Sequence, residues 1–259
     1  MSVDPKLLQL EKEIPTCPLF TDCESNAGQS IQLSAIAAAD PRRGTHDARI
    51  LIVTEAPDTK SAKGVAYRGG TGTRIMRMFL RPQYRIGLDY PDYGTEGLPA
   101  FLEKMRIYQT SAVKCVLGVG TANLGERVIT NCRQKFLDEQ VARLHDLELI
   151  LPMGRLATAS VLHRPLGSVD FDEVIGRRGR GLLQADPYYG LMIVALPHPS
   201  GINRSFNPPV FRPGDGPNEI RRKQAFVRAL LTIRTKLGSM GYTLQVLRQE
   251  QPRGPLDRF

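Results

Sequence analysis

Two residues of this chain, a glutamate and a histidine, each follow an apolar run, a position at which enzymes often have reactive groups. Glu55 comes two residues after the run 50–53, and His198 comes directly after the run 193–197. Such runs are typical of buried strands, and an open α/β sheet binds its ligands where strands hand over to loops. A carboxylate there can orient water or stabilise a cation, and an imidazole can donate a hydrogen bond to a developing anion. His198 also lies between two prolines, which restrict the backbone of its loop.

Four cysteines form a second candidate site. Cys17 and Cys23 lie near the N-terminus, whereas Cys115 and Cys132 lie in the middle of the chain. In the reducing cytoplasm that we expect for this chain, structural disulfides are rare, so metal ligation and plain burial are the remaining explanations. Four thiolates suit an iron–sulfur cluster or a structural zinc ion, and both tolerate ligands that are widely spaced in the sequence.

The pattern of apolar residues predicts the elements that position these groups. Buried strands are predicted at residues 48–54, 107–113, 147–151 and 191–196. Helical periodicity is found at residues 5–14, 71–80, 133–145, 155–163 and 218–237. This alternation of strands and helices favours an α/β fold, a three-layer α/β/α sandwich with a central four-stranded parallel sheet.

We expect a single domain over residues 1–259, which is long enough to bury a sizeable core. Residues 1–47 contain the N-terminal helix and the cysteine loop, residues 48–238 the α/β core, and residues 239–259 a C-terminal tail. Residues 81–98, rich in Tyr, Pro, Gly and Asp, are predicted to form a surface insertion.

The overall charge of the chain favours a polyanionic partner. Lys and Arg outnumber Asp and Glu by 35 to 26, which gives a net charge of +9 at pH 7. Nucleic acid fits this surplus, although the same surplus spread evenly over the surface would fit a generic basic protein. No apolar run approaches the roughly 20 residues of a membrane span, and the first residues do not resemble a signal peptide. We therefore expect a cytoplasmic monomer with no membrane partner.

Segments in the same order as in a known family carry more specific information. Residues 52–57 and 64–72 resemble the first motif of the family-4 uracil-DNA glycosylases, Gly-Glu-Ala-Pro-Gly and then Gly-Arg-Pro-Phe-Val-Gly-x-x-Gly. Residues 107–115 are similar to the family stretch Tyr-x-Thr-Asn-Val-Val-Lys-Cys, and residues 149–157 to its Leu-Gly-x-x-Ala turn. Residues 198–204 resemble the second motif, His-Pro-Ser/Ala-x-x-x-Arg.

The resemblance implies a DNA glycosylase of the uracil-DNA glycosylase superfamily, closest to its iron–sulfur family-4 and family-5 enzymes. Such an enzyme flips a damaged or deaminated base out of DNA and hydrolyses its N-glycosidic bond, as a step of base excision repair. No lysine nucleophile is singled out for lyase chemistry, so a monofunctional enzyme is implied. The four cysteines are similar to the ligand set of the family's [4Fe–4S] cluster, although the first two are more widely spaced here.

The resemblance also implies individual roles. The catalytic candidates are His198, which would donate to the departing base, Glu55, which would act on the water or the sugar cation, and Asp58 as its substitute. The base-binding candidates are Tyr67, on which the flipped base would stack, Ser111 and Ala56. The DNA-binding candidates are Ser200, Ile202, Asn203 and Arg204, and Phe206 at the end of the same loop would help to fill the gap left by the flipped nucleotide.

The chain departs from the family pattern at several positions. In the first motif Thr54 and Asp58 replace glycines, and residues 59–63 replace the acidic loop. Further along the chain, Ser111 replaces the Asn that reads the edge of uracil in the family. A hydroxyl cannot make both hydrogen bonds that an amide makes, so uracil selectivity is in question, and Asn203 is the obvious candidate to replace the amide.

Two alternatives remain. The first is a catalytically weak or inactive member of the superfamily that binds damaged or single-stranded DNA. The second, more distant, is a cluster-binding nucleotide enzyme that holds phosphate in the turn 69–72.

Overall fold

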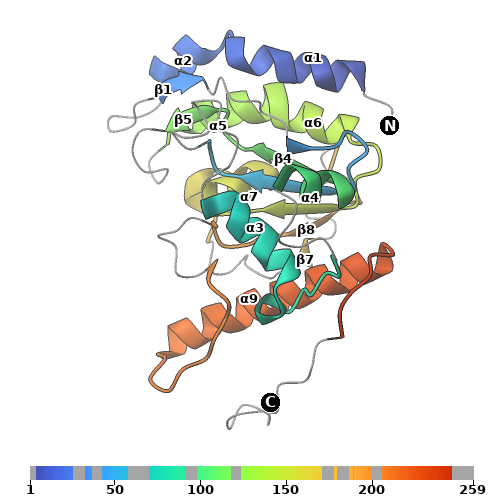
Figure 1. Cartoon of the computed structure of the whole chain (residues 1–259). Coiled ribbons are helices and arrows are strands. Elements are labelled where there is room, and N and C mark those ends of the chain that lie inside the picture. Colours follow the sequence, from blue (N-terminus) through green and yellow to red (C-terminus); the bar gives the residue numbers. More distant parts are fainter. Residues whose placement is uncertain are drawn as a thin grey trace.

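The computed structural model places a mainly parallel sheet at the centre of the protein (Figure 1). It describes residues 4–25, 33–36, 43–57, 70–90, 98–117, 124–170, 178–179, 187–188, 190–199 and 206–246. Within these residues the sheet has six strands, in the order β2, β4, β3, β6, β8, β7. Their bounds are β2 Arg43–Gly44, β3 Ile50–Thr54, β4 Ile107–Ser111, β6 Leu149–Pro152, β7 Arg178–Gly179 and β8 Met192–Val194.

The four inner strands are parallel, as the sequence predicts. β3 pairs in parallel with β4 and β6, and β6 pairs in parallel with β8. Every residue of β3, β4 and β6 is buried. Burial on both faces explains why β3 and β6 are continuous apolar runs. β2 and β7 add two antiparallel residues each at the edges of the sheet, and strands this short leave no recognisable pattern in the sequence.

Helices cover both faces of the sheet and complete the predicted three layers. The layer on one face contains α1 (Pro5–Glu13), α5 (Glu126–Cys132), α6 (Asp138–Arg143) and α7 (Arg155–Val161). The layer on the other face contains α3 (Gly70–Leu80), α4 (Leu98–Lys104) and α9 (Pro217–Ser239). Figure 1 shows α1 and α6 above the sheet and α9 below it. Each layer forms its own apolar core against the sheet, which fixes the strand ends where the candidate residues lie.

Some helices differ from the sequence prediction. Cys23 lies in α2 (Phe20–Ser25), where a loop is predicted, and α4 and α5 are absent from the predicted helices. The predicted helix 133–145 is the second part of a longer helical run, and its first turn, Arg133–Leu137, is π-helical. The missed helices have six or seven residues, which is too short to show a helical period.

The surface insertion predicted at residues 81–98 is corrected in its first half. The alternating apolar residues Tyr84, Ile86, Leu88 and Tyr90 are all buried. They pack in the same core as α3 and α9. The backbone is not a regular strand here, because Tyr84 ends a 3-10 turn and Arg85 and Gly87 have left-handed φ values of +62° and +59°. A segment of turns has no helix or strand period, so the sequence pattern did not reveal that it is buried. Residues 91–97 lie outside the described part of the chain.

A two-stranded sheet carries one of the cysteines. β1 (Leu33–Ile36) pairs antiparallel with β5 (Cys115–Leu117), with Ile36 opposite Cys115. β5 follows β4 after a turn of three residues, so Cys115 lies close to the carboxyl end of the central sheet. The N-terminal region and the central sheet therefore meet near Cys115.

Candidate active site and cysteine pocket

Glu55 lies directly after β3 and joins this strand to the start of α7. The backbone N–H of Leu156 donates to Glu55 Oε1 at 3.1 Å, so the carboxylate occupies the position of an N-cap for this short helix. Gly154, which precedes α7, has a φ of +96°. A Cβ at Gly154 would lie 2.4 Å from Glu55 Oε1, so only glycine leaves room for the carboxylate. Gly154 therefore allows the Glu55 side chain to approach the start of α7 closely.

His198 lies near Glu55 because β8 pairs in parallel with β6, so the chain leaves both strands at the same edge of the sheet. The backbone N–H of Gly154 donates to the carbonyl of Leu196 at 2.8 Å, two residues before His198. Burial lowers the pKa of the half-buried His198 imidazole, and the Glu55 carboxylate opposes this effect. A neutral imidazole is therefore favoured at neutral pH, next to a carboxylate. The structure brings these two predicted catalytic residues together at the carboxyl ends of parallel strands.

Ser111 and Thr54, two residues at which the chain departs from the family pattern, contact each other. They lie opposite one another in the parallel pairing of β3 with β4, and both are buried. Their hydroxyl oxygens are 3.0 Å apart, and Thr54 Oγ1 also lies 3.2 Å from the carbonyl oxygen of Thr110, to which it can donate. A glycine at position 54 would remove this contact. The two departures therefore act as one hydroxyl pair beside Glu55.

Of the other predicted site residues, the structure describes only Ala56 and Phe206. Ala56 is partly buried and packs against the core on the α7 side of the sheet. The remaining candidates, Asp58, Tyr67, Ser200, Ile202, Asn203 and Arg204, lie outside the described residues.

Phe206 is not available to fill a gap in DNA, contrary to the sequence prediction. Its side chain is fully buried, and its ring lies 6.0 Å from the Tyr84 ring and 5.9 Å from the Phe226 ring, measured between centroids. The hydroxyl of Tyr84 donates to the Phe206 carbonyl at 3.1 Å. Phe206 is an aromatic core residue that anchors the end of the loop after His198.

Comparison with known protein families agrees with this geometry. The family model described as "Uracil DNA glycosylase superfamily" matches residues 41–227. The chain belongs to this superfamily. The match contains the whole central sheet with Glu55 and His198 at its carboxyl edge. A search of curated proteins found no significant match.

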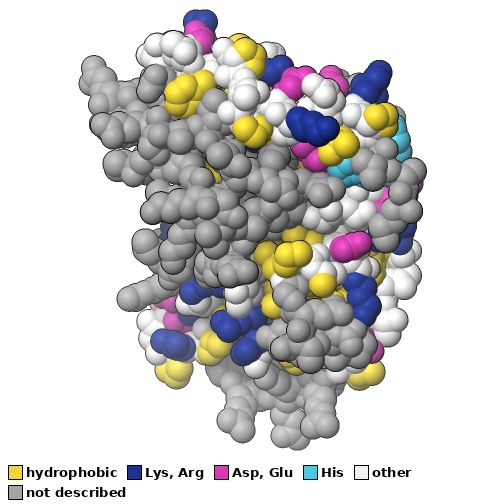
Figure 2. Space-filling model, turned by 45° about the horizontal axis from the view of Figure 1, so that its top comes forward, with side chains coloured by type: hydrophobic (Ala, Val, Ile, Leu, Met, Phe, Trp, Pro, Cys, Tyr) yellow, Lys and Arg dark blue, Asp and Glu magenta, His cyan; other side chains and the backbone are white. Residues whose placement is uncertain are grey.

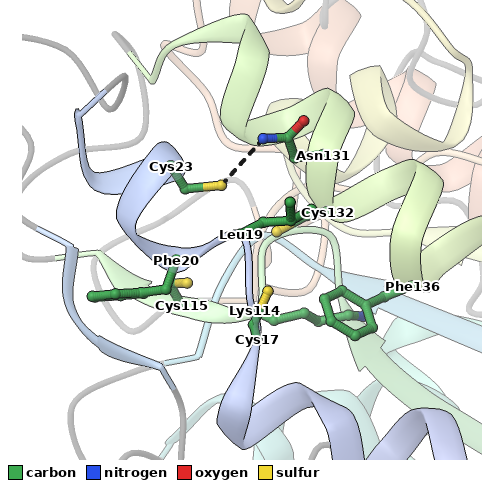
Figure 3. A pocket seen from close by; sticks show the side chains of 9 residues that line it. All are labelled: Cys17, Leu19, Phe20, Cys23, Lys114, Cys115, Asn131, Cys132 and Phe136. Atoms are coloured by element: carbon green, nitrogen blue, oxygen red, sulfur yellow. Dashed lines mark hydrogen bonds between the residues drawn. The ribbon is translucent and has the colours of Figure 1, made fainter.

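All four cysteines of this superfamily member line one pocket, although they come from distant parts of the chain (Figure 3). Cys17 precedes α2, Cys23 lies within it, Cys115 begins β5 and Cys132 ends α5. None of them is in a disulfide. In Figure 3 the amide of Asn131 donates to Cys23 Sγ, at 3.6 Å.

Burial favours the protonated thiol at three of the four cysteines of this pocket. Burial raises the pKa of Cys132 to about 11, and it raises the pKa values of Cys115 and Cys23 as well. Four thiols around one pocket are a donor set that suits an iron–sulfur cluster. Among the described residues, no three His, Cys, Asp or Glu side chains are placed to hold one metal ion.

The structure adds one residue that the sequence analysis did not single out. Lys114 is buried beside Cys115, and its Nζ donates to Thr110 Oγ1 and to the Ser111 carbonyl, both at 2.6 Å. It lines the cysteine pocket and holds the residue at the predicted base-reading position. The signal in the sequence was a lysine inside a buried segment, next to a candidate metal ligand.

Basic side chains are distributed unevenly on the face shown in Figure 2. Several Lys and Arg side chains gather in its lower left part, next to residues that the structure does not describe, whereas both charges mix at its top. The positive charges of three arginines lie close enough to lower the pKa of the Tyr84 hydroxyl, against the larger opposite effect of burial. These residues are Arg74, Arg77 and Arg81. Part of the positive surplus is thus concentrated at α3 and the residue that follows it.

Proposed function

We propose that the protein is a monofunctional DNA glycosylase, which hydrolyses the N-glycosidic bond of uracil or another deaminated base after flipping it out of DNA. Superfamily membership supports a glycosylase in general. The observation that carries the proposal is the placement of Glu55 beside His198 at the carboxyl ends of β3 and β8. A carboxylate and a neutral imidazole at this edge suit a reaction that creates a cation and an anion together.

The reaction separates charge, and each residue stabilises one side of it. The electron pair of the N-glycosidic bond leaves with the base, which becomes an anion, and the sugar becomes an oxocarbenium-like cation. His198 donates a hydrogen bond to the oxygen of the base, a contact worth about 3 to 4 kcal/mol when it is preorganised. The Glu55 carboxylate stabilises the sugar cation, orients the water that attacks it and accepts the proton that this water loses. The departed base anion takes up a proton from solvent, and Glu55 returns its proton to solvent.

We also propose that Cys17, Cys23, Cys115 and Cys132 hold a [4Fe–4S] cluster. The shared pocket and the free thiols of the four cysteines support this proposal. Such a cluster would supply a covalent tie between α2, β5 and α5.

DNA carrying a damaged or deaminated base is the proposed partner of a monomeric protein. The net charge of +9 and the basic side chains at α3 support binding to a polyanion. Among the described residues, no helix is both long enough and apolar enough to cross a membrane.

The test is base excision from defined oligonucleotides. The purified protein is incubated with DNA that contains uracil, hypoxanthine or xanthine, and abasic sites are then cleaved with alkali. We expect strand cleavage for at least one base, and a loss of about 100-fold or more in rate for His198→Ala. His145→Ala is the matched control, because the side chain of His145 is 73% exposed.

The Thr54–Ser111 contact supports a second candidate function, DNA binding without efficient base excision. The Thr54–Ser111 hydroxyl pair stands at the predicted base-reading position, so this protein can be a superfamily member that binds DNA without efficient excision. DNA binding with no cleavage of any of the three substrates would establish this second function and overturn the first.

A further inference from the structure

The amide of Gln109 is buried in the central sheet without a hydrogen-bond partner. Gln109 lies in the middle of β4, and its side chain is fully buried. Within the described part of the chain, neither its Oε1 nor its Nε2 makes a hydrogen bond. An amide can donate two hydrogen bonds and accept two, so this side chain leaves all of its capacity unused. A buried polar group without a partner destabilises a fold, and a functional role is one of the few reasons to keep it.

The other polar side chains of β4 are all paired. The Tyr108 hydroxyl donates to a carboxylate of α1 at 2.8 Å, and the Thr110 hydroxyl donates to an amide oxygen of α6 at 3.1 Å. The Ser111 hydroxyl lies 3.0 Å from the Thr54 hydroxyl. The unused amide of Gln109 is therefore an exception in a strand that otherwise satisfies its buried polar side chains.

Gln109 lies on the same face of the sheet as Ser111. Side chains alternate along a strand, so these two residues point to one side and the residue between them points to the other. Opposite Gln109 in β3 is Ile52, which packs in the core formed with α3 and α9. The predicted base-stacking residue Tyr67 precedes α3 by three residues in the sequence. We therefore expect the flipped base on the side of the sheet that holds Gln109.

We propose that Gln109 reads the flipped base, in place of the family Asn at position 111. Its amide pairs with a base edge on which an N–H lies beside a C=O, because the amide oxygen accepts from the first and the amide N–H donates to the second. Uracil, hypoxanthine and xanthine share this edge. Glutamine is one methylene longer than asparagine, and the smaller Ser111 leaves room for a base to reach Gln109. This inference rests on the proposed glycosylase function and names the class of base that the site recognises.

Thermal unfolding of the free protein separates base reading from support of the fold. Gln109→Met keeps the length of the side chain but removes an amide that has no partner among the described residues. We expect its melting temperature to rise by about 2 to 4 °C. Gln140→Met is the matched control, because Gln140 is also fully buried but its amide is bonded to Tyr108 and Lys114. We expect Gln140→Met to lower the melting temperature.

Excision and binding measure the reading itself. We expect Gln109→Met to lower kcat/KM about 10- to 100-fold on each base that wild type removes, and Gln9→Met, at an exposed position of α1, to leave it unchanged. Binding is measured with DNA that carries uracil or hypoxanthine on a 2′-fluorinated sugar, which resists cleavage because fluorine destabilises the sugar cation. We expect wild type to bind this DNA more tightly than the same DNA without the modified nucleotide, and Gln109→Met to lose most of that preference.

Three results would overturn the inference. They are a Gln109→Met protein that melts below wild type, a variant with unchanged excision or unchanged binding preference, and a wild type without any preference for the fluorinated DNA. A wild type that excises no base contradicts the proposed reaction. The binding preference of wild type and of Gln109→Met then still decides whether Gln109 reads the base.

Discussion

At the scale of single residues, the side chains that depart from the family pattern also touch. Thr54 and Ser111 share a hydrogen bond at the carboxyl ends of β3 and β4. Ser111 is therefore not a lone substitution for the family Asn, because its hydroxyl already has a buried partner. If Ser111 reads the base as predicted, we expect base selectivity to depend on both positions together, which the sequence alone did not reveal.

We predict that Ser111→Asn raises uracil excision relative to hypoxanthine excision, and that Thr54→Gly with Ser111→Asn raises it further. The amide matches the edge of uracil, and removal of Thr54 gives it room, since overpacking a buried site costs about 1 to 3 kcal/mol. The ratio of the two excision rates in wild type and both variants is the measurement. An unchanged ratio in the double variant would show that another residue reads the base.

Gly154 offers a test of how Glu55 is positioned. Gly154→Ala places a methyl group 2.4 Å from Glu55 Oε1, so we expect it to displace the carboxylate and lower excision. Gly214→Ala is the matched control, because Gly214 has a similar φ of +97° and open space around its Cα. Both variants strain the backbone, at a cost of about 1 to 3 kcal/mol in unfolding free energy. Equal excision rates for the two folded variants would argue against a role for Glu55.

His198 links stability to pH. Burial lowers its pKa in the folded protein, against the opposing effect of Glu55, so the unfolded chain binds more protons below about pH 6.5. The contribution of neutral His198 is complete above that pH and is lost as the pH falls through the folded pKa. Denaturant unfolding at a series of pH values should show less acid loss of stability for His198→Gln than for wild type. Parallel profiles would mean that His198 titrates alike in both states.

At the scale of elements, the cysteine pocket lies where α2 and α5 already meet, through the ion pair of Asp22 with Arg127 at 2.7 Å and the hydrogen bond that Asn131 donates to Asp22 at 2.9 Å. It is built from α2, the start of β5 and the end of α5, which come from two separate regions of the sequence. A π-helical turn directly follows Cys132, and the structure gives no physical reason for it. A bound cluster would add a further tie to the polar contacts that hold α2 against α5.

We therefore predict that Cys115→Ala lowers the unfolding free energy and abolishes metal binding, because it removes one tie between β5 and α2. Anaerobically purified wild type should be brown and contain about four iron atoms per chain. Iron analysis and thermal unfolding of both proteins are the measurements. A colourless wild type with one zinc ion per chain would replace the cluster by a zinc site.

At the scale of the whole molecule, the positive charge of the protein is expected to contribute to its affinity for DNA. The net charge is +9, and arginines cluster at α3. Neutralisation of phosphates releases counterions, so binding driven by these charges weakens as salt is added.

We predict that affinity for duplex DNA falls steeply between low and physiological salt, and that Arg204→Ala weakens it at every salt concentration. Fluorescence anisotropy with a labelled oligonucleotide measures both effects. Arg212→Ala is a control on the same stretch of chain, because its backbone N–H, and not its charge, bonds Asp215. Binding that is independent of salt would contradict a nucleic-acid partner.

The sequence by itself determined the central architecture and the place of the two candidate catalytic residues in it. Four apolar runs predict the parallel strands, since strands buried on both faces have no polar side to break the run. The same runs place Glu55 and His198 at the carboxyl edge, because parallel strands end together. Short elements such as α2 and β7 escaped prediction because they contain less than two full periods of their pattern.

Only the tertiary structure decided which side chains meet. The contact of Thr54 with Ser111 depends on the register of β3 against β4, and the need for Gly154 depends on how α7 approaches β3. The burial of Phe206 and the position of Lys114 depend on packing between segments that are far apart in sequence. Sequence patterns record which face of an element is buried. They do not record which neighbour buries it. At the candidate site these neighbours decide which side chains contact one another.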